Sequence, residues 1–77
     1  MSEESEVLIN FGRRMREIRE SKEVSQESLT HIAELDRTYV SGVERGVRNI
    51  SLKNIHRIAA ALDVSPAMFF QNDRGDL

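Results

Sequence analysis

The chain has 77 residues, with 11 Lys and Arg against 13 Asp and Glu, and it contains no Cys. This length allows one small domain with a modest core and leaves no room for a second domain that senses a ligand, so we expect no small-molecule ligand. The absence of Cys excludes disulfides and thiolate metal sites, and the lack of both a basic leader and an apolar run of ~20 residues predicts a cytoplasmic protein without membrane association.

The net charge of −2 is unevenly distributed along the chain. Five of the acidic residues lie near the two ends, where we expect an acidic disordered tail over 1–6 and a frayed tail over 72–77. Residues 7–71 then form the domain. Between Arg37 and Arg57 five basic residues stand against one acidic residue, and such a basic segment favours binding to the phosphates of nucleic acid.

The first predicted helix, from about Val7 to Lys22, rests on apolar residues that recur at steps of three and four. They are Leu8, Phe11, Met15 and Ile18. Four further helix starts share one pattern, in which an apolar residue precedes a Ser or Asp and a second apolar residue follows four positions later. The Ser or Asp caps the helix, and the two apolar residues staple its start. The capped starts are Val24-Ser25 with Leu29, Leu35-Asp36 with Val40, Ile50-Ser51 with Ile55, and Val64-Ser65 with Phe69.

The helices that follow these starts are each expected to bury one apolar face. The expected core residues are Leu29, Ile32 and Ala33, then Val40 and Val43, then Ile55, Ile58, Ala59 and Leu62, and finally Phe69. Pro66 stands at the first position of the last helix, where its missing N–H costs nothing. No segment alternates with the period of a strand, and only 45–50 has the length of a real loop. The predicted fold is all-α, with five short helices.

The second and third predicted helices begin only eleven residues apart, which is the spacing of a helix-turn-helix unit. In such a unit the first residues of the second helix contact base edges in a DNA groove. Here those residues are Arg37, Thr38 and Tyr39, and Ser41 lies about one turn further on. An Arg fork matches guanine O6 and N7, while Thr can hydrogen-bond and touch a thymine methyl group. The alternative is an ordinary solvated helix start with a half-buried Tyr ring.

From Phe11 to Phe70 the sequence resembles the Cro and repressor-type, or XRE-like, helix-turn-helix proteins. The matching positions are Arg19, Ser25-Gln26 with Leu29, Tyr39-Val40-Ser41, Glu44-Arg45-Gly46, and Ile58-Ala59 through Leu62, Val64 and Ser65. Within that family the run over 35–49, on so short a chain, is most similar to the controller proteins of restriction-modification systems. Glu23 and Glu34 depart from the pattern, because the family often has Gly there, and a left-handed conformation at either residue would cost about 1 kcal/mol.

Phosphate contacts are expected at two helix starts. Gln26 takes the first position of its helix, at the positive end of the helix dipole, where a phosphate can be held. The resemblance implies the same role for Gln26, a second phosphate clamp formed by Asn49, Ser51 and Lys53 with Arg45 nearby, and an approach of Arg48 to the DNA. Ser51 and Asn49 as simple caps, and Arg48 as a solvated loop residue, are the alternatives. The resemblance also implies a structural ion pair between Arg19 and Glu44.

The segment after Pro66 carries more apolar residues than its own core contact needs. Beside the inward Phe69 stand Ala67, Met68 and Phe70, and excess apolar surface on a small domain marks an interface. The resemblance implies dimerisation through this C-terminal helix, and the alternative is a helix folded deeper into its own core. His31 and His56 have neither Cys nor an acidic cluster beside them, so we expect no metal site and no cofactor.

These patterns together predict a sequence-specific transcriptional regulator that binds a pseudo-palindromic operator in double-stranded DNA as a homodimer. The resemblance implies control of its own gene and of a restriction endonuclease gene, with activation at moderate occupancy and repression when a second dimer fills the promoter. The alternatives are a Cro-like phage repressor and a helix-turn-helix antitoxin or protein-interaction module. An enzyme is not expected, because no nucleophile turn, phosphate loop or metal cluster accompanies the polar residues.

Overall fold

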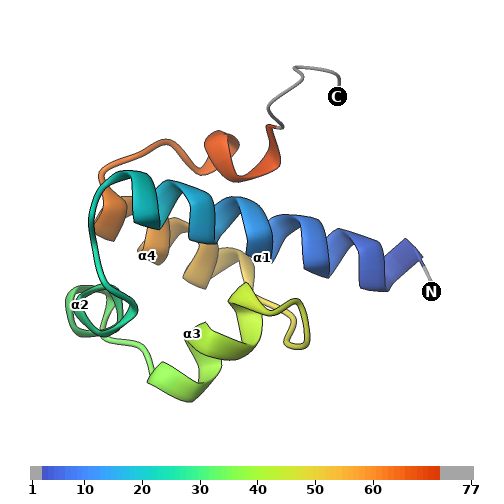
Figure 1. Ribbon diagram of the computed structural model, residues 1–77, viewed down its shortest axis with the longest axis horizontal. Helices are drawn as coiled ribbons and strands as arrows, with labels where there is room; N and C mark the ends of the chain where they lie inside the picture. The colour runs from blue at the N-terminus through green and yellow to red at the C-terminus, as the bar shows by residue number, and fades with distance from the viewer. Residues whose placement is uncertain (1–2, 72–77) are drawn as a thin grey trace.

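Four α-helices and one 3-10 helix make up the fold in the computed structural model, which describes residues 3–71 (Figure 1). They are α1 (Glu3–Ser21), α2 (Gln26–Ala33), α3 (Arg37–Glu44), α4 (Leu52–Leu62) and the 3-10 helix η1 (Pro66–Phe70). The predicted all-α class is confirmed, since 3–71 contain no strand. None of the helices in this part of the chain is long and apolar enough to cross a membrane.

The fifth predicted helix is a 3-10 helix and not an α-helix. Its Met68 N–H donates to Ser65 O at 3.0 Å, three residues back, and Gln71 N–H donates to Met68 O at 3.4 Å. This bonding pattern defines a 3-10 helix. The physical reason is length, because a segment of five residues has little room for bonds four residues apart.

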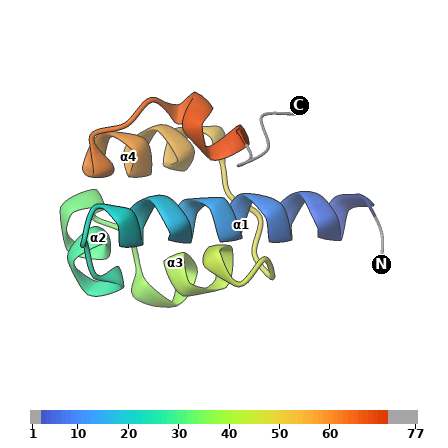
Figure 2. The same ribbon diagram turned by 45° about the horizontal axis from the view of Figure 1, so that its top comes forward.

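The long helix α1 lies across the middle of the molecule, with α2 and α3 on one side and α4 and η1 on the other (Figure 2). α1 packs against α3 and η1, and α2 packs against α3 and α4. The α1–α3 crossing is close: a Cβ on Gly12 would lie 2.2 Å from the Val43 carbonyl oxygen, so only glycine fits there. The buried apolar side chains are Phe11, Met15, Ile18, Leu29, Ala33, Val40, Val43, Ile58, Ala59, Leu62 and Phe69.

The four predicted N-caps are confirmed. Each capping oxygen accepts a hydrogen bond from a backbone N–H of the first turn, as the sequence pattern requires. The bonds are Ser28 N to Ser25 Oγ at 3.0 Å, Thr38 N to Asp36 Oδ2 at 3.0 Å, Asn54 N to Ser51 Oγ at 3.1 Å and Ala67 N to Ser65 Oγ at 3.3 Å. The predicted helix starts are therefore correct for α2, α3, α4 and η1.

Two details of the sequence prediction are wrong. The first helix begins at Glu3 and not near Val7, so 3–6 are helical where a disordered tail was expected. The helix dipole favours acidic residues in a first turn, which accounts for the longer helix. Ile32 is 56% exposed although it was assigned to the core. Thr30 is buried in its place, with its hydroxyl donating to Glu27 O at 2.7 Å, so the buried face of α2 contains Thr30 and not Ile32.

The ends of three helical segments use left-handed residues other than glycine. Glu23 and Glu34, the two positions at which the family often has Gly, have φ values of 58° and 57°, so both residues adopt the left-handed conformation. Asp63, which was not predicted, ends α4 with a φ of 57°. A left-handed conformation is unfavourable for a residue with a Cβ, so each helix end stores a small strain.

Replacing Glu34 by Gly should stabilise the protein. We expect Glu34→Gly to raise the free energy of unfolding by about 0.5 to 1 kcal/mol, because glycine adopts a positive φ without a Cβ clash. The matched control is Glu27→Gly, an exposed position inside the same helix, where the same substitution should lower it by about 1 kcal/mol. Urea unfolding followed by circular dichroism measures both, and changes of the same sign would contradict the prediction.

Candidate nucleic-acid interface

The turn between α2 and α3 fixes the first turn of α3 at the outer edge of the molecule (Figure 1). Leu35 is half-buried against the core and Val40 is fully buried, so the predicted staple anchors the start of α3. The Asp36 side chain accepts from the backbone of this turn. Arg37 and Thr38 are consequently left exposed to solvent with their side chains directed away from the core.

A third candidate in this turn, Tyr39, meets a residue from the loop after α3. Tyr39 is half-buried and packs against the core, and the Arg48 guanidinium carbon lies 5.4 Å from its ring centroid. The structure therefore brings Arg48 to the first turn of α3, although it is nine residues away from Tyr39 in the sequence. Four of the five predicted base-contacting residues form this surface, and they are Arg37, Thr38, Tyr39 and Arg48.

The fifth candidate, Ser41, lies apart from them in a hollow between α1, α2 and α3. The residues that line this hollow are Arg16, Arg19, Gln26, Ser41, Glu44 and Arg45. At its base Glu44 accepts hydrogen bonds from Arg19 Nε at 2.7 Å and from Arg19 Nη2 at 3.0 Å. The structure thus contains the expected ion pair, and it is buried. The hydrogen bond with Glu44 raises the pKa of Arg19 above its ordinary value, so the guanidinium stays charged.

Gln26 is oriented by the same carboxylate. Its side-chain Nε2 donates to Glu44 Oε1 at 3.1 Å, which ties the first residue of α2 to the last residue of α3. A Gln amide has two N–H donors, so the second remains available at the start of α2. Arg45 is exposed at the end of α3, beside the hollow.

The start of α4 presents the remaining predicted phosphate contacts. Ser51 caps the helix, as the alternative assigned to it, whereas Asn49 Oδ1 accepts from the Ile50 N–H at 2.9 Å, just before the helix begins. Asn49, Ser51 and Lys53 are all exposed. The amide NH₂ of exposed Asn49 keeps its two N–H donors, so these hydrogen bonds leave the residues able to contact a ligand.

Two residues at this surface were not identified from the sequence. Asn54, in the first turn of α4, donates through Nδ2 to Tyr39 Oη at 3.0 Å. Gly42 lies beneath the Arg48 side chain. A glycine inside a predicted helix was a signal for a close approach of another group, because glycine otherwise weakens a helix. Nothing in the sequence pattern connects Asn54 with Tyr39.

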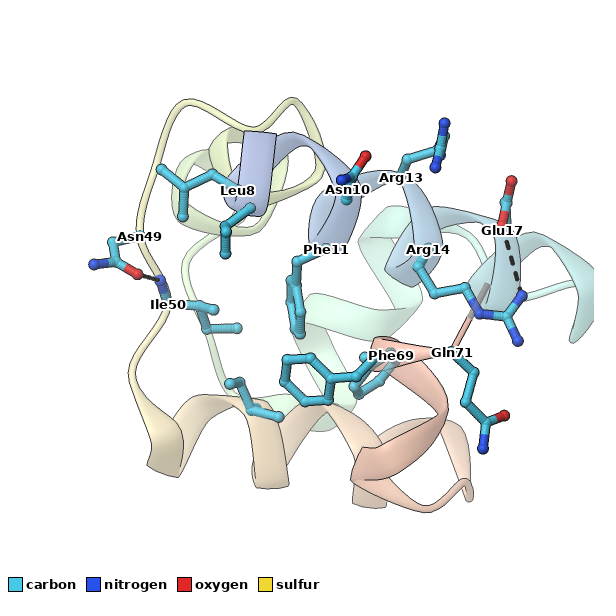
Figure 3. Close-up of a pocket in the computed structure, with 13 residues that line it drawn as sticks. Leu8, Asn10, Phe11, Arg13, Arg14, Glu17, Asn49, Ile50, Phe69 and Gln71 are labelled. Carbon is cyan, nitrogen blue, oxygen red and sulfur yellow. Dashed lines mark hydrogen bonds and ion pairs between the residues drawn. The ribbon is translucent and has the colours of Figure 1, made fainter. Parts of the chain in front are cut away.

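A separate groove of about 740 Å³, lined by both apolar and polar side chains, lies between α1, the start of α4 and η1 (Figure 3). Phe11 and Phe69 point toward one another there, with ring centroids 5.4 Å apart, while Arg13 points away. The Phe70 ring also lies 5.4 Å from Phe11. Arg14 Nε donates to Met68 O at 3.0 Å and thereby ties η1 to α1.

The three residues predicted at a dimer interface differ in their surroundings. Phe70 is 57% exposed at the edge of the groove, and Ala67 is exposed. Met68 is half-buried and packs against the hydrophobic core. Met68 therefore anchors η1 to the hydrophobic core, and Phe70 is the large apolar side chain of η1 that is exposed to solvent.

The chain is similar in sequence and structure to helix-turn-helix control proteins. The sequence profile of the helix-turn-helix family matches residues 15–69. The control protein C.BamHI from Bacillus amyloliquefaciens is 49% identical over 61 residues, which cover 78% of this chain and 75% of that protein. The crystal structure of the restriction-modification controller protein C.AhdI from Aeromonas hydrophila has a TM-score of 0.82 and 52% identity, covering 84% of this chain and 98% of that chain. The controller protein C.Esp1396I, solved as a tetramer in complex with its natural 35 base-pair operator, has a TM-score of 0.76 and 39% identity, covering 83% of this chain and 84% of that chain.

Removing the Glu44 carboxylate should destabilise both the fold and the junction of α1, α2 and α3. We expect Glu44→Ala to lower the free energy of unfolding by about 3 to 5 kcal/mol, because it leaves the buried Arg19 guanidinium without its partner. Glu20→Ala is the control, since Glu20 pairs with Arg16 at 3.2 Å on the exposed face of α1, and it should cost less than about 1 kcal/mol. Chemical denaturation measures both variants, and similar small losses would contradict the prediction.

Proposed function

We propose, from the premise that this chain belongs to the helix-turn-helix family and within it to the restriction-modification controller proteins, that it is a sequence-specific transcriptional regulator. The observation that carries the proposal is the first turn of α3, where exposed Arg37 and Thr38 stand beside Tyr39 and Arg48. The proposed target is a pseudo-palindromic operator, and the proposed place of action is therefore the cytoplasm. We further propose that two dimers bind one promoter, which the C.Esp1396I tetramer on its operator supports, and that the protein controls its own gene and an endonuclease gene.

The base contacts come from the start of α3. A recognition helix enters the major groove with its N-terminal residues against the base edges. Arg37 and Thr38 are exposed there, and the Arg fork suits guanine O6 and N7. Ser41 lies further along α3, in the hollow with Gln26. We propose that it contacts the edge of the DNA major groove.

The phosphate contacts flank the recognition helix on both sides. On one side Gln26 is held by Glu44, with an amide N–H available at the positive end of α2. Arg45 lies beside the same hollow. On the other side Asn49, Ser51 and Lys53 surround the start of α4. Phosphate contacts at two helix starts fix the orientation of the protein on the duplex and carry no sequence information themselves.

We assign the groove edge around Phe70 to a second copy of this chain. A symmetric dimer buries the same patch of both copies, so an exposed aromatic ring such as Phe70 meets its own symmetry mate or the groove beside it. Exposed Val7 also lines the groove and adds to the apolar surface. Such a dimer presents two recognition helices about one DNA turn apart, roughly 34 Å.

The base contact of Arg37 tests the proposed function. Selection of bound sequences from random DNA should yield one preferred operator, and Arg37→Ala should weaken binding to it by about 1 to 3 kcal/mol and relax the preference at one position in each half-site. Gln26→Ala is the control, because loss of a phosphate contact should weaken binding to all sequences equally. Equal losses on operator and random DNA for Arg37→Ala would show that it contacts only phosphate. A protein that selects no sequence, and shifts DNA only with a second protein present, would be an interaction module.

The dimer surface is tested by placing a charge on Phe70. We expect Phe70→Glu to give a folded monomer, because the carboxylate would have to be buried across the dimer axis. Ile32→Glu is a closely matched control, since Ile32 is 56% and Phe70 57% exposed but Ile32 lies on α2, away from the groove. Sedimentation equilibrium should find Ile32→Glu dimeric. A Phe70→Glu variant with an unchanged dimer mass would exclude this surface.

A further inference from the structure

Tyr39 is held from two sides. On one side Asn54 Nδ2 donates to Tyr39 Oη at 3.0 Å, which joins the start of α4 to the first turn of α3. On the other side the Arg48 guanidinium carbon lies 5.4 Å from the ring centroid, a distance at which a cation is attracted to an aromatic face. The ring also packs against the hydrophobic core. The position of the Tyr39 hydroxyl is thereby fixed before any ligand binds.

Gly42 determines where Arg48 lies. A Cβ at residue 42 would lie 2.3 Å from Arg48 Cγ, and the three nearest heavy atoms all belong to the Arg48 side chain. The Gly42 carbonyl also accepts hydrogen bonds from Val47 N–H at 3.0 Å and from Arg48 N–H at 3.2 Å. The aliphatic part of Arg48 therefore rests on the helix surface that Gly42 leaves bare, and a side chain at residue 42 would displace it.

Both held side chains keep hydrogen-bond donors for a ligand. Asn54 uses the Tyr39 oxygen as an acceptor, so the Tyr39 O–H proton remains to be donated. The Arg48 guanidinium carries five N–H donors, and within the described stretch 3–71 it makes no hydrogen bond or ion pair. Neighbouring donors of this kind suit a ligand rich in acceptors, such as phosphate oxygens and the N7, O6 and O4 atoms of bases.

We propose that Asn54 and Gly42 are positioning residues that hold Tyr39 and Arg48 together as one donor pair for acceptor groups of DNA, an inference that rests on the function proposed above. Neither positioning residue has to touch the DNA. Asn54 also donates its backbone N–H to the Ser51 cap at 3.1 Å. Asn54 therefore fixes the position of the phosphate-contacting start of α4 relative to the base-contacting first turn of α3.

A double-mutant cycle tests the role of Asn54. Asn54→Ala, Tyr39→Phe and the double variant of the full chain are titrated with the selected operator by fluorescence anisotropy at fixed salt. Asn54→Ala should weaken binding about 3- to 10-fold, the effect of one hydrogen bond, and should have no further effect when Tyr39 is already Phe. Equal losses in both backgrounds would show that Asn54 acts independently of Tyr39 and would overturn its assignment.

A second cycle tests Gly42. Gly42→Ala should weaken operator binding as Arg48→Ala does, by about 5- to 150-fold, and should cost nothing more in the Arg48→Ala background. Its thermal midpoint should not fall, because Ala favours a helix over Gly and the three heavy atoms nearest the added Cβ all belong to the Arg48 side chain. A loss that persists in the Arg48→Ala background would overturn the assignment of Gly42.

The wild-type protein separates failure of this inference from failure of the proposed function. If it selects no sequence from random DNA, the regulator function fails. If it selects an operator but Asn54→Ala and Gly42→Ala both bind that operator as tightly as wild type, the function stands and the positioning inference is overturned. Circular dichroism of each variant verifies folding, and if one variant is unfolded the other cycle decides the outcome.

Discussion

The buried ion pair between Arg19 and Glu44 is the constraint on which the placement of the recognition helix depends. Glu44 accepts two hydrogen bonds from α1 and one from Gln26 of α2, so three helices meet at one carboxylate. Arg19 also donates to Val24 O at 2.9 Å and holds the turn that leads into α2. Two charges removed from water are costly to separate, so these contacts must form together. Gly12 permits them by letting α1 approach the end of α3 closely.

Most of the fold was predictable because its helix starts are encoded locally. A capping oxygen and an apolar staple act within five residues, so Ser25, Asp36, Ser51 and Ser65 were identified without knowledge of the rest of the chain. The errors arose where packing chooses between similar options. Ile32 and its neighbours on α2 offer two possible buried faces, and contact with α3 and α4 selects the one containing Thr30.

The candidate site could be predicted from the sequence only at the level of single residues. The helix-turn-helix spacing placed Arg37 and Thr38 at an exposed helix start, and the structure has them there. The relations between residues were not predictable, because the contact of Asn54 with Tyr39 joins two helices whose angle is set by the core. Met68 shows the same limit: its apolar character was evident, while its burial depends on how η1 folds back onto α1.

The hydrogen bond from Arg14 to Met68 O has a consequence for the length of DNA that the protein can accept. It joins η1 to α1, and α1 packs closely on α3 at the Gly12 crossing, so the proposed dimer surface and the recognition helix are connected through packed helices. One base pair inserted between half-sites would shift them by about 3.4 Å and rotate them by about 34°. The proposed dimer would have to break contacts in the core of each copy to follow this shift, so we expect it to discriminate between spacer lengths as well as between bases.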